Sequence, residues 1–423
     1  MQNVIFKFSI ISVISVITLF CASVLNANTI DDIQDKIDIA NKNRAALEKE
    51  IAGYQNQLKT IGEQANTLQN TIKSLDVSTN KITTEVKLVE TNIKKTSYTI
   101  QDTGLEILNK EQQINKGNLA IKSSLRQINE ADNMSVWEIL LANDDMTDFW
   151  TEIDNIIQVQ AKIGDQVITT KSIKTKLEIA KADLELQKKE LEDYTKELAD
   201  RKNILLSTKK EKNTILTTTK NTEANYQKIL KDKLALKEAL DAEINQFESQ
   251  LRLAIDPKSF PPAGKGILKW PLDNIYITQN FGKTADSGRL YVSGTHNGVD
   301  FRAAIGTRLL SSGNGVVEAV GNTDTVCPGA SYGKWIFIRY DNGLASTYGH
   351  LSVISVKAGQ RIKTGEVIGY SGNTGYSTGP HLHLSVYAGQ GVQISTLKST
   401  VCKGTYTIPI ADPKAYLDPL IYL

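Results

Sequence analysis

The chain has 423 residues, with 49 lysines and arginines against 47 aspartates and glutamates, and its formal net charge is +2. This near balance gives no general electrostatic reason for nucleic-acid binding, because counterion release needs a concentrated basic surface. Residues 30–256 hold five of the 28 glycines and no proline, whereas residues 257–423 hold all nine prolines and all four histidines. This division predicts two physically different domains.

The N-terminus has the pattern of an export signal. Residues 1–27 run from Lys7 through an apolar stretch to Ala27, and we expect a signal peptide cleaved after Ala27. The alternative is an uncleaved membrane anchor, because the apolar run is about long enough to span a bilayer. Either alternative predicts an exported chain in the cell envelope, either periplasmic or associated with the cell wall. Two cysteines then remain, Cys327 and Cys402, as one disulfide or as two separate thiols.

Residues 28–253 are expected to form a long antiparallel α-helical coiled-coil hairpin. Apolar residues follow 3-4 spacing from Ile30 to Ile100, and leucine recurs every seven residues from Leu177 to Leu205. Such a repeat predicts a left-handed supercoil. The return arm carries the same signal at Tyr226, Leu230, Leu240, Ile244, Phe247 and Leu251.

The two predicted helices, 30–130 and 153–253, are nearly equal in length, which predicts a tip at about residues 131–152. The tip is rich in large apolar side chains, among them Trp137, Phe149 and Trp150. They are expected either to bury one another in a small helical cap or to form a docking surface for a protein partner. Prolines in residues 254–265 end the helix and predict a linker.

Residues 266–423 are expected to form a mostly antiparallel β domain. Short β-rich runs at residues 275–278, 315–320, 335–340, 367–370 and 383–387 alternate with glycine turns.

The four histidines all lie in this β-rich part. On an extended strand His296 and Asp300 share a face, with Gly298 between them adding no side chain that would obstruct an ion. His381 and His383 project together for the same reason. Two imidazoles and one carboxylate make the three-ligand shell of a catalytic Zn²⁺, with the fourth position left for water.

Segments 294–304, 348–351 and 377–383 resemble the three signature segments of the lysostaphin and LytM-type peptidoglycan endopeptidases, metallopeptidase family 23. Residues 279–282 and 359–369 fit the same pattern, and the resemblance covers roughly residues 266–398. It implies that His296, Asp300 and His383 are zinc ligands and that His350 and His381 are unligated catalytic histidines. His381 is the candidate base for the attacking water, and His350 the candidate for stabilising the oxyanion or protonating the leaving amine.

The resemblance implies a secreted zinc metalloendopeptidase that cleaves peptide stems or cross-links of peptidoglycan. The coil joined to such a domain also resembles the division-associated murein hydrolase regulators, whose coil docks on a membrane transporter complex of the FtsE/FtsX type. The alternative function is a non-enzymatic activator of a separate cell-wall amidase, although members of that group typically lack some metal residues and this sequence retains all five. A hairpin of this length could also cover its own catalytic cleft.

Overall fold

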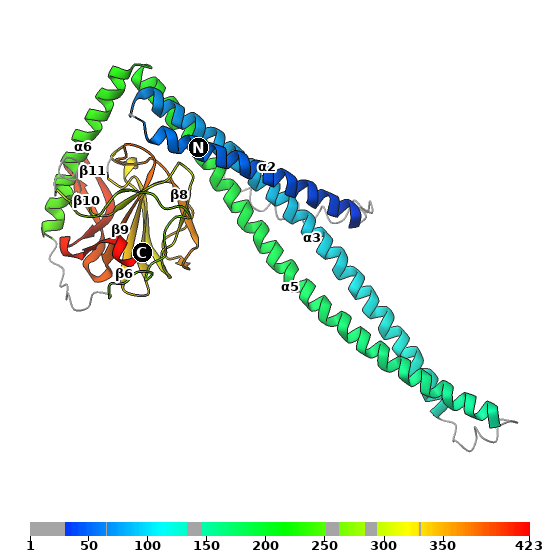
Figure 1. The fold of residues 1–423 in the computed structure, drawn as a ribbon. Coiled ribbons are helices and arrows are strands. Elements are labelled where there is room, and N and C mark those ends of the chain that lie inside the picture. Colours follow the sequence, from blue (N-terminus) through cyan, green and yellow to red (C-terminus); the bar gives the residue numbers. More distant parts are fainter. Residues whose placement is uncertain (1–29, 65, 133–145, 251–261, 284–293, 330) are drawn as a thin grey trace, which may run out of the picture. The chain divides into compact units, whose positions relative to one another are not determined.

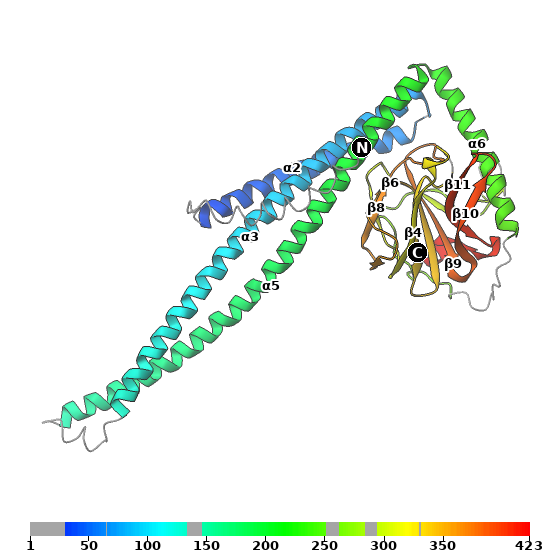
Figure 2. The same cartoon turned by 180° about the vertical axis from the view of Figure 1, so that it is seen from behind.

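The computed structural model describes residues 30–64, 66–132, 146–250, 262–283, 294–329 and 331–423. Long helices precede an antiparallel β domain, as Figures 1 and 2 show, and this confirms the fold class expected from the sequence. The expected signal peptide, Trp137 of the expected tip and part of the expected linker lie outside the described residues.

Within the described ranges, no helix combines the length and apolar character that crossing a bilayer requires. The long helices are α2 (Ile30–Gly62), α3 (Leu68–Asp132), α5 (Met146–Thr219) and α6 (Glu223–Gln250).

Two compact units divide the chain, Met1–Ala45 with Thr91–Thr195 and Ala46–Glu90 with Lys196–Leu423. In the first unit α3 and α5 pack against each other, with Ile107, Leu177 and Ala180 buried between them. Gln187 Nε2 donates to Thr103 Oγ1 at 3.1 Å beside this contact. Trp150, at the start of α5, is 61% exposed.

The expected continuous helix over residues 30–130 is wrong, because one helix ends at Gly62 and the next begins at Leu68. Glycine is a common residue at a helix C-terminus, and Thr67 caps α3 by accepting from the backbone N–H of Asn70 at 3.2 Å. In the second unit Leu58 of α2 packs with Val77 of α3. The heptad spacing therefore identified the apolar faces correctly. These faces belong to two helices that pack on each other, and not to a single long helix.

The expected return helix over residues 153–253 is also broken. α5 ends at Thr219, and Lys220 and Asn221 adopt left-handed backbone conformations, with φ of 50° and 56°. α6 begins at Glu223 and packs on the β domain. Leu240, expected in the coil seam, packs instead beside the Cys327–Cys402 pair of the β domain, and Figures 1 and 2 show α6 running beside the β10–β11 hairpin.

The β domain contains one large antiparallel sheet and a separate hairpin. The main strand order is β1-β2-β9-β6-β5-β4-β7, with β8 pairing with β3 and β6, and β12 with β9. The strands of the large sheet are β1 (Ile277–Gln279), β2 (Val299–Arg302), β3 (Arg308–Leu310), β4 (Gly315–Asn322), β5 (Lys334–Tyr340), β6 (Leu344–Ile354), β7 (Arg361–Ile362), β8 (Val367–Ser371), β9 (His381–Ala388) and β12 (Tyr416–Leu417). The hairpin consists of β10 (Val392–Ser399) and β11 (Gly404–Ala411), and the short helix α8 (Pro419–Tyr422) closes the chain.

Period-two alternation places an apolar cluster on each face of the sheet. On β5, Ile336 and Ile338 enter one buried cluster, whereas Trp335 and Phe337 enter the other. On β9 the leucines that alternate with the histidines, Leu382 and Leu384, face the first cluster. The histidines of β9 therefore project from the opposite face, where the candidate site lies.

Of the two alternatives for the cysteines, the structure has the disulfide. Cys327 and Cys402 are bridged, with their Cα atoms 5.5 Å apart. Cys402 lies in the turn between β10 and β11, whereas Cys327 follows the short helix η3 (Thr323–Thr325). The bridge thus joins the turn of the separate hairpin to a loop of the main sheet.

Candidate metal centre

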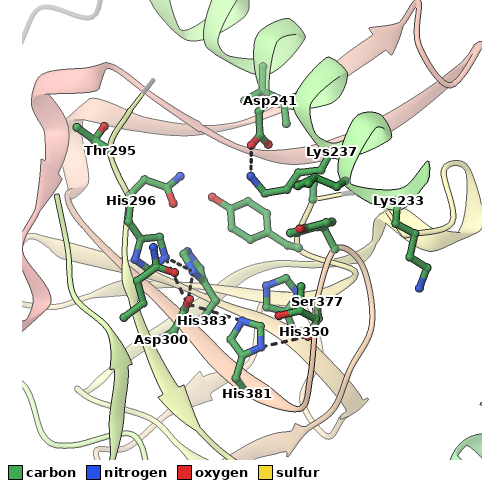
Figure 3. A pocket seen from close by; sticks show the side chains of 18 of the residues that line it. Lys233, Lys237, Asp241, Thr295, His296, Asp300, His350, Ser377, His381 and His383 are labelled. Carbon is green, nitrogen blue, oxygen red and sulfur yellow. Dashed lines mark hydrogen bonds and ion pairs between the residues drawn. The ribbon is translucent and has the colours of Figure 1, made fainter. Parts of the chain in front are cut away.

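Two adjacent strands bring the three expected ligands together. Asp300 on β2 lies directly opposite His383 on β9 in the antiparallel register. His296 precedes β2 and forms an isolated β-bridge with Gly282. One ligand atom from each of His296, Asp300 and His383 lies within 4.8 Å of the others, and Figure 3 shows the three side chains pointing toward one another. Within the described ranges no further His, Cys, Asp or Glu joins this group.

The ligand atoms have the spacing that a small tetrahedral ion requires. His383 Nδ1 lies 2.9 Å from Asp300 Oδ1, and His296 Nε2 lies 3.3 Å from the same oxygen. The two imidazole nitrogens are 3.1 Å apart. Ligands of a tetrahedral zinc with bonds of roughly 2.0–2.1 Å lie about 3.3 Å from one another. The residues present therefore fit a zinc ion.

Hydrogen bonds behind the two imidazoles set which nitrogen carries the proton. His296 Nδ1 donates to the backbone carbonyl of Asn280 at 3.0 Å, because a carbonyl can only accept. The lone pair of His296 is then on Nε2, which is the atom facing Asp300. His383 Nε2 lies 2.9 Å from Ser385 Oγ, and donation to that hydroxyl leaves the lone pair on Nδ1. Both rings are thus oriented as metal ligands usually are, with the other ring N–H held by an acceptor.

Replacing Ser385 by Ala is expected to weaken metal binding without removing a ligand. The change deletes the hydroxyl that holds His383 Nε2, so the imidazole loses its fixed tautomer and orientation. Loss of such a partner typically costs about 10–100-fold in metal affinity. A competition titration with a zinc-binding dye measures this, and an unchanged affinity would show that the hydroxyl does not orient the ring.

The two remaining histidines lie beside the same group. His350 Nδ1 donates to the carbonyl of Thr374 at 2.8 Å, and His381 Nδ1 donates to the carbonyl of Gly379 at 2.8 Å. The two ring centroids are 4.6 Å apart. His381 Nε2 lies 3.7 Å from Asp300 Oδ1. All five residues expected from the sequence therefore line one cavity.

His350 has a strained backbone. Its φ is 64°, in the left-handed region that residues with a Cβ rarely adopt, and its backbone N–H donates to the carbonyl of Tyr332 at 2.7 Å. Such strain persists only where surrounding structure holds it, and it is concentrated at functional sites.

The electrostatics favour a charged carboxylate at Asp300 and neutral imidazoles at His383 and His350. Burial opposes the charge of Asp300, but His381, His296 and His383 outweigh it and hold the pKa of the carboxyl well below its usual range. Burial lowers the pKa of His383, and burial together with the neighbouring histidines lowers that of His350 well below the ordinary value. A neutral imidazole and an ionised carboxylate are the forms that bind a metal ion.

The sequence did not single out the groups that orient these rings. Ser385 lies two residues after His383 on the same strand face, so the period of two could have identified it. The carbonyls of Asn280, Thr374 and Gly379 give no side-chain signal. Gly298 is required for another reason than the one expected: a Cβ there would lie 2.5 Å from the Leu384 carbonyl and 2.8 Å from the His383 ring.

Comparison with known proteins identifies this part of the chain. Residues 294–395 match the model of Peptidase family M23. The peptidoglycan DD-endopeptidase ShyA of Vibrio cholerae is 38% identical over 138 residues, which cover 31% of this chain and 30% of ShyA. The DD-carboxypeptidase/endopeptidase Mpg of Neisseria meningitidis is 42% identical over 88 residues, covering 21% of this chain and 19% of Mpg.

Solved structures are also similar to part of this chain. The catalytic domain of lysostaphin from Staphylococcus simulans is 34% identical and covers 28% of this chain and 83% of that chain, with a TM-score of 0.24. The chain spans less than a third of the length of the curated relatives that it matches. Residues 294–395 form a peptidase family M23 domain.

Proposed function

We propose that the protein is a zinc endopeptidase that hydrolyses an amide bond in the peptide part of peptidoglycan. The observation that carries this proposal is the convergence of His296, Asp300 and His383 beside two further histidines that do not join the ligand group. Three protein ligands are the usual set of a catalytic zinc, whereas a structural zinc takes four. The relatives named as peptidoglycan endopeptidases support the substrate class.

The zinc, when bound, would acidify a water molecule and polarise the scissile carbonyl. His381 is the proposed general base, because its Nδ1 proton is engaged with Gly379 and its Nε2 faces the ligand group. His350 likewise has its Nδ1 proton engaged, so its Nε2 becomes a donor only after it has accepted a proton. Once protonated, His350 would stabilise the developing oxyanion or protonate the leaving amine.

The alternative, a non-enzymatic activator of an amidase, requires no catalytic histidine. The retention of His350 and His381 with oriented rings favours the enzyme, because a pure binding surface would not need two engaged Nδ1 protons or a strained residue at 350. Export to the cell envelope, a role in division and contact of the coil tip with a transporter of the FtsE/FtsX type are further parts of the proposal.

Metal removal tests the enzyme directly. We expect chelation of the full-length protein to abolish the release of peptide fragments from purified peptidoglycan, and stoichiometric zinc to restore it, because the proposed reaction depends on the ion. Fragment release is measured by mass spectrometry of the soluble material. Release that persists in the metal-free protein would contradict the proposal, and stimulation of a separate amidase by protein that itself releases nothing would favour the activator.

A further inference from the structure

The imidazole and the backbone of His350 are each held by a loop outside the strand that carries this residue. Its backbone N–H donates to the carbonyl of Tyr332 at 2.7 Å, and its Nδ1 donates to the carbonyl of Thr374 at 2.8 Å. Figure 3 shows the His350 ring near that of His381 at the candidate metal centre. A residue with φ of 64° keeps this conformation only when its surroundings hold it. The position of His350 therefore depends on what holds these two carbonyls.

The two loops that supply the carbonyls pack backbone against backbone. The first is the η3 loop, residues 323–329 and 331–333, and the second follows β8 and comprises residues 372–376. Gly333 and Gly375 meet where the loops touch, and both adopt the left-handed conformation, with φ of 61° and 68°. A Cβ on Gly375 would lie 2.2 Å from the Gly333 nitrogen, so the contact requires glycine. The η3 loop is therefore the surface on which the second loop is placed.

One carboxylate joins the two loops. Asp324 lies in η3, where its Oδ2 accepts from the backbone N–H of Gly375 at 2.8 Å and its Oδ1 accepts from that of Gly329 at 2.7 Å. Hydrogen bonds to a charged group are about twice as strong as neutral ones. Asn322 caps η3 by accepting from the backbone N–H of Asp324 at 3.1 Å, and the disulfide at Cys327 anchors the chain one turn later. The carboxylate therefore holds the second loop from a fixed position.

The N–H that Asp324 binds and the carbonyl that His350 binds are the two ends of one peptide group. Residues 374 and 375 are consecutive, so the carbonyl of Thr374 and the N–H of Gly375 lie in one plane and, in a trans peptide, point in opposite directions. Asp324 on one side and the imidazole of His350 on the other thus hold the same rigid unit. A hydrogen bond to the peptide N–H also polarises the carbonyl, which strengthens the bond that this carbonyl accepts.

The carbonyl that holds His381 cannot be fixed in this way. His381 Nδ1 donates to the carbonyl of Gly379, but residue 380 is proline, which has no backbone N–H for a carboxylate to bind. Ser377 Oγ lies 3.1 Å from His381 Nδ1 and supplies the neighbouring polar contact. The two histidines therefore differ in what stands behind their acceptors, and His381 is an internal reference for His350.

We propose that Asp324 is the positioning residue of His350 and acts through the Thr374–Gly375 peptide, whose N–H it binds and whose carbonyl holds the imidazole. The role of the oriented ring in peptide cleavage rests on the function proposed above, whereas the orientation itself does not. Without the Asp324 carboxylate the peptide is free to rotate, and the imidazole loses its fixed direction while the zinc ligands keep theirs.

The test follows the ring proton of His350 in the full-length, zinc-loaded protein. With ¹⁵N-labelled histidine, NMR measures how fast each Nδ1 proton exchanges with solvent, and the signal lost in His350→Asn or His381→Asn assigns each ring. Asp324→Ala removes both hydrogen bonds, whereas Asp324→Asn keeps the shape of the side chain and offers one acceptor oxygen in place of two. Asp273→Ala, which removes an exposed carboxylate paired with Arg308, is the matched control. Zinc content and circular dichroism check the ligand group and the fold.

We expect Asp324→Ala to speed the exchange of the His350 proton about tenfold or more over the wild type and Asp273→Ala, since a hydrogen bond to a charged group shifts an equilibrium by at least that factor. The exchange of the His381 proton should not change, and Asp324→Asn should give a smaller increase at His350. Peptidoglycan cleavage at saturating substrate should fall about tenfold in Asp324→Ala, with the zinc content unchanged.

Two results would overturn the positioning role. One is exchange at the wild-type rate in folded Asp324→Ala, or in Asp324→Asn where the Ala variant does not fold. The other is equal acceleration at His350 and His381, which would show a general loosening of the domain. Faster exchange at His350 alone, with cleavage unchanged, would support the positioning of the ring and count against its proposed part in catalysis.

Discussion

Replacing His383 by Ala is expected to abolish both zinc binding and peptidoglycan cleavage. The change removes one of three ligands and leaves Asp300 and His296, which cannot hold a tetrahedral ion alone at comparable affinity. Because the ion is proposed to supply both nucleophile and electrophile, we expect cleavage to fall roughly a thousandfold or more, equivalent to about 4 kcal/mol of transition-state stabilisation. Zinc content by elemental mass spectrometry and initial rates on purified peptidoglycan measure the two effects.

Lys398→Ala is the control for this experiment, because Lys398 is exposed on β10 and lies away from the ligand group. It should retain about one zinc per chain and the wild-type rate. A His383→Ala protein that keeps its zinc would contradict the ligand assignment, and one that loses zinc but still cleaves would contradict the role of the ion.

Replacing His381 by Asn separates catalysis from metal binding. The Asn amide can donate to the Gly379 carbonyl in place of His381 Nδ1, but it has no basic atom in place of Nε2. We expect zinc binding to change little and the rate to fall about 10²–10⁴-fold, the usual contribution of a positioned general base. The rate at saturating substrate, compared with the zinc content, measures this.

His350→Asn is the parallel variant at the second catalytic position. Asn tolerates the left-handed backbone of residue 350 better than most residues, and its amide can donate to the Thr374 carbonyl. This variant should also keep its zinc and lose activity. Full activity in either Asn variant would remove that histidine from the mechanism.

The sequence predicted the elements whose signal lies in side-chain periodicity. The heptad pattern identified the helical region, and the runs at 315–320, 335–340 and 367–370 correspond to β4, β5 and β8. β6 was missed because its two buried faces include Ser346, Thr347 and Ser352, which do not resemble an apolar strand. The two helix breaks were missed because the heptad pattern continues through them, although Gly62 and Thr67 are ordinary stop and start signals.

The candidate site was predictable in its side chains but not in its surroundings. His296, Asp300 and His383 meet because the register of two antiparallel strands, distant in the sequence, places residue 300 opposite residue 383. The family resemblance predicted that these three residues meet. The period of two on a strand predicted only that His296 shares a face with Asp300, and His381 with His383. The backbone carbonyls that orient the rings have no sequence signature. The sequence did not predict that α6 packs on the β10–β11 hairpin, because the spacing of Leu240 and Ile244 also fits the seam of a coiled coil.

The measurement that tests the central claim most directly is mass spectrometry of the new chain ends in purified peptidoglycan after incubation with the zinc-loaded full-length protein. We predict new amino and carboxyl ends within the peptide part, and about 10²–10⁴-fold fewer of them after the same incubation with the His381→Asn protein. Peptides left intact by the zinc-loaded protein would contradict the claim.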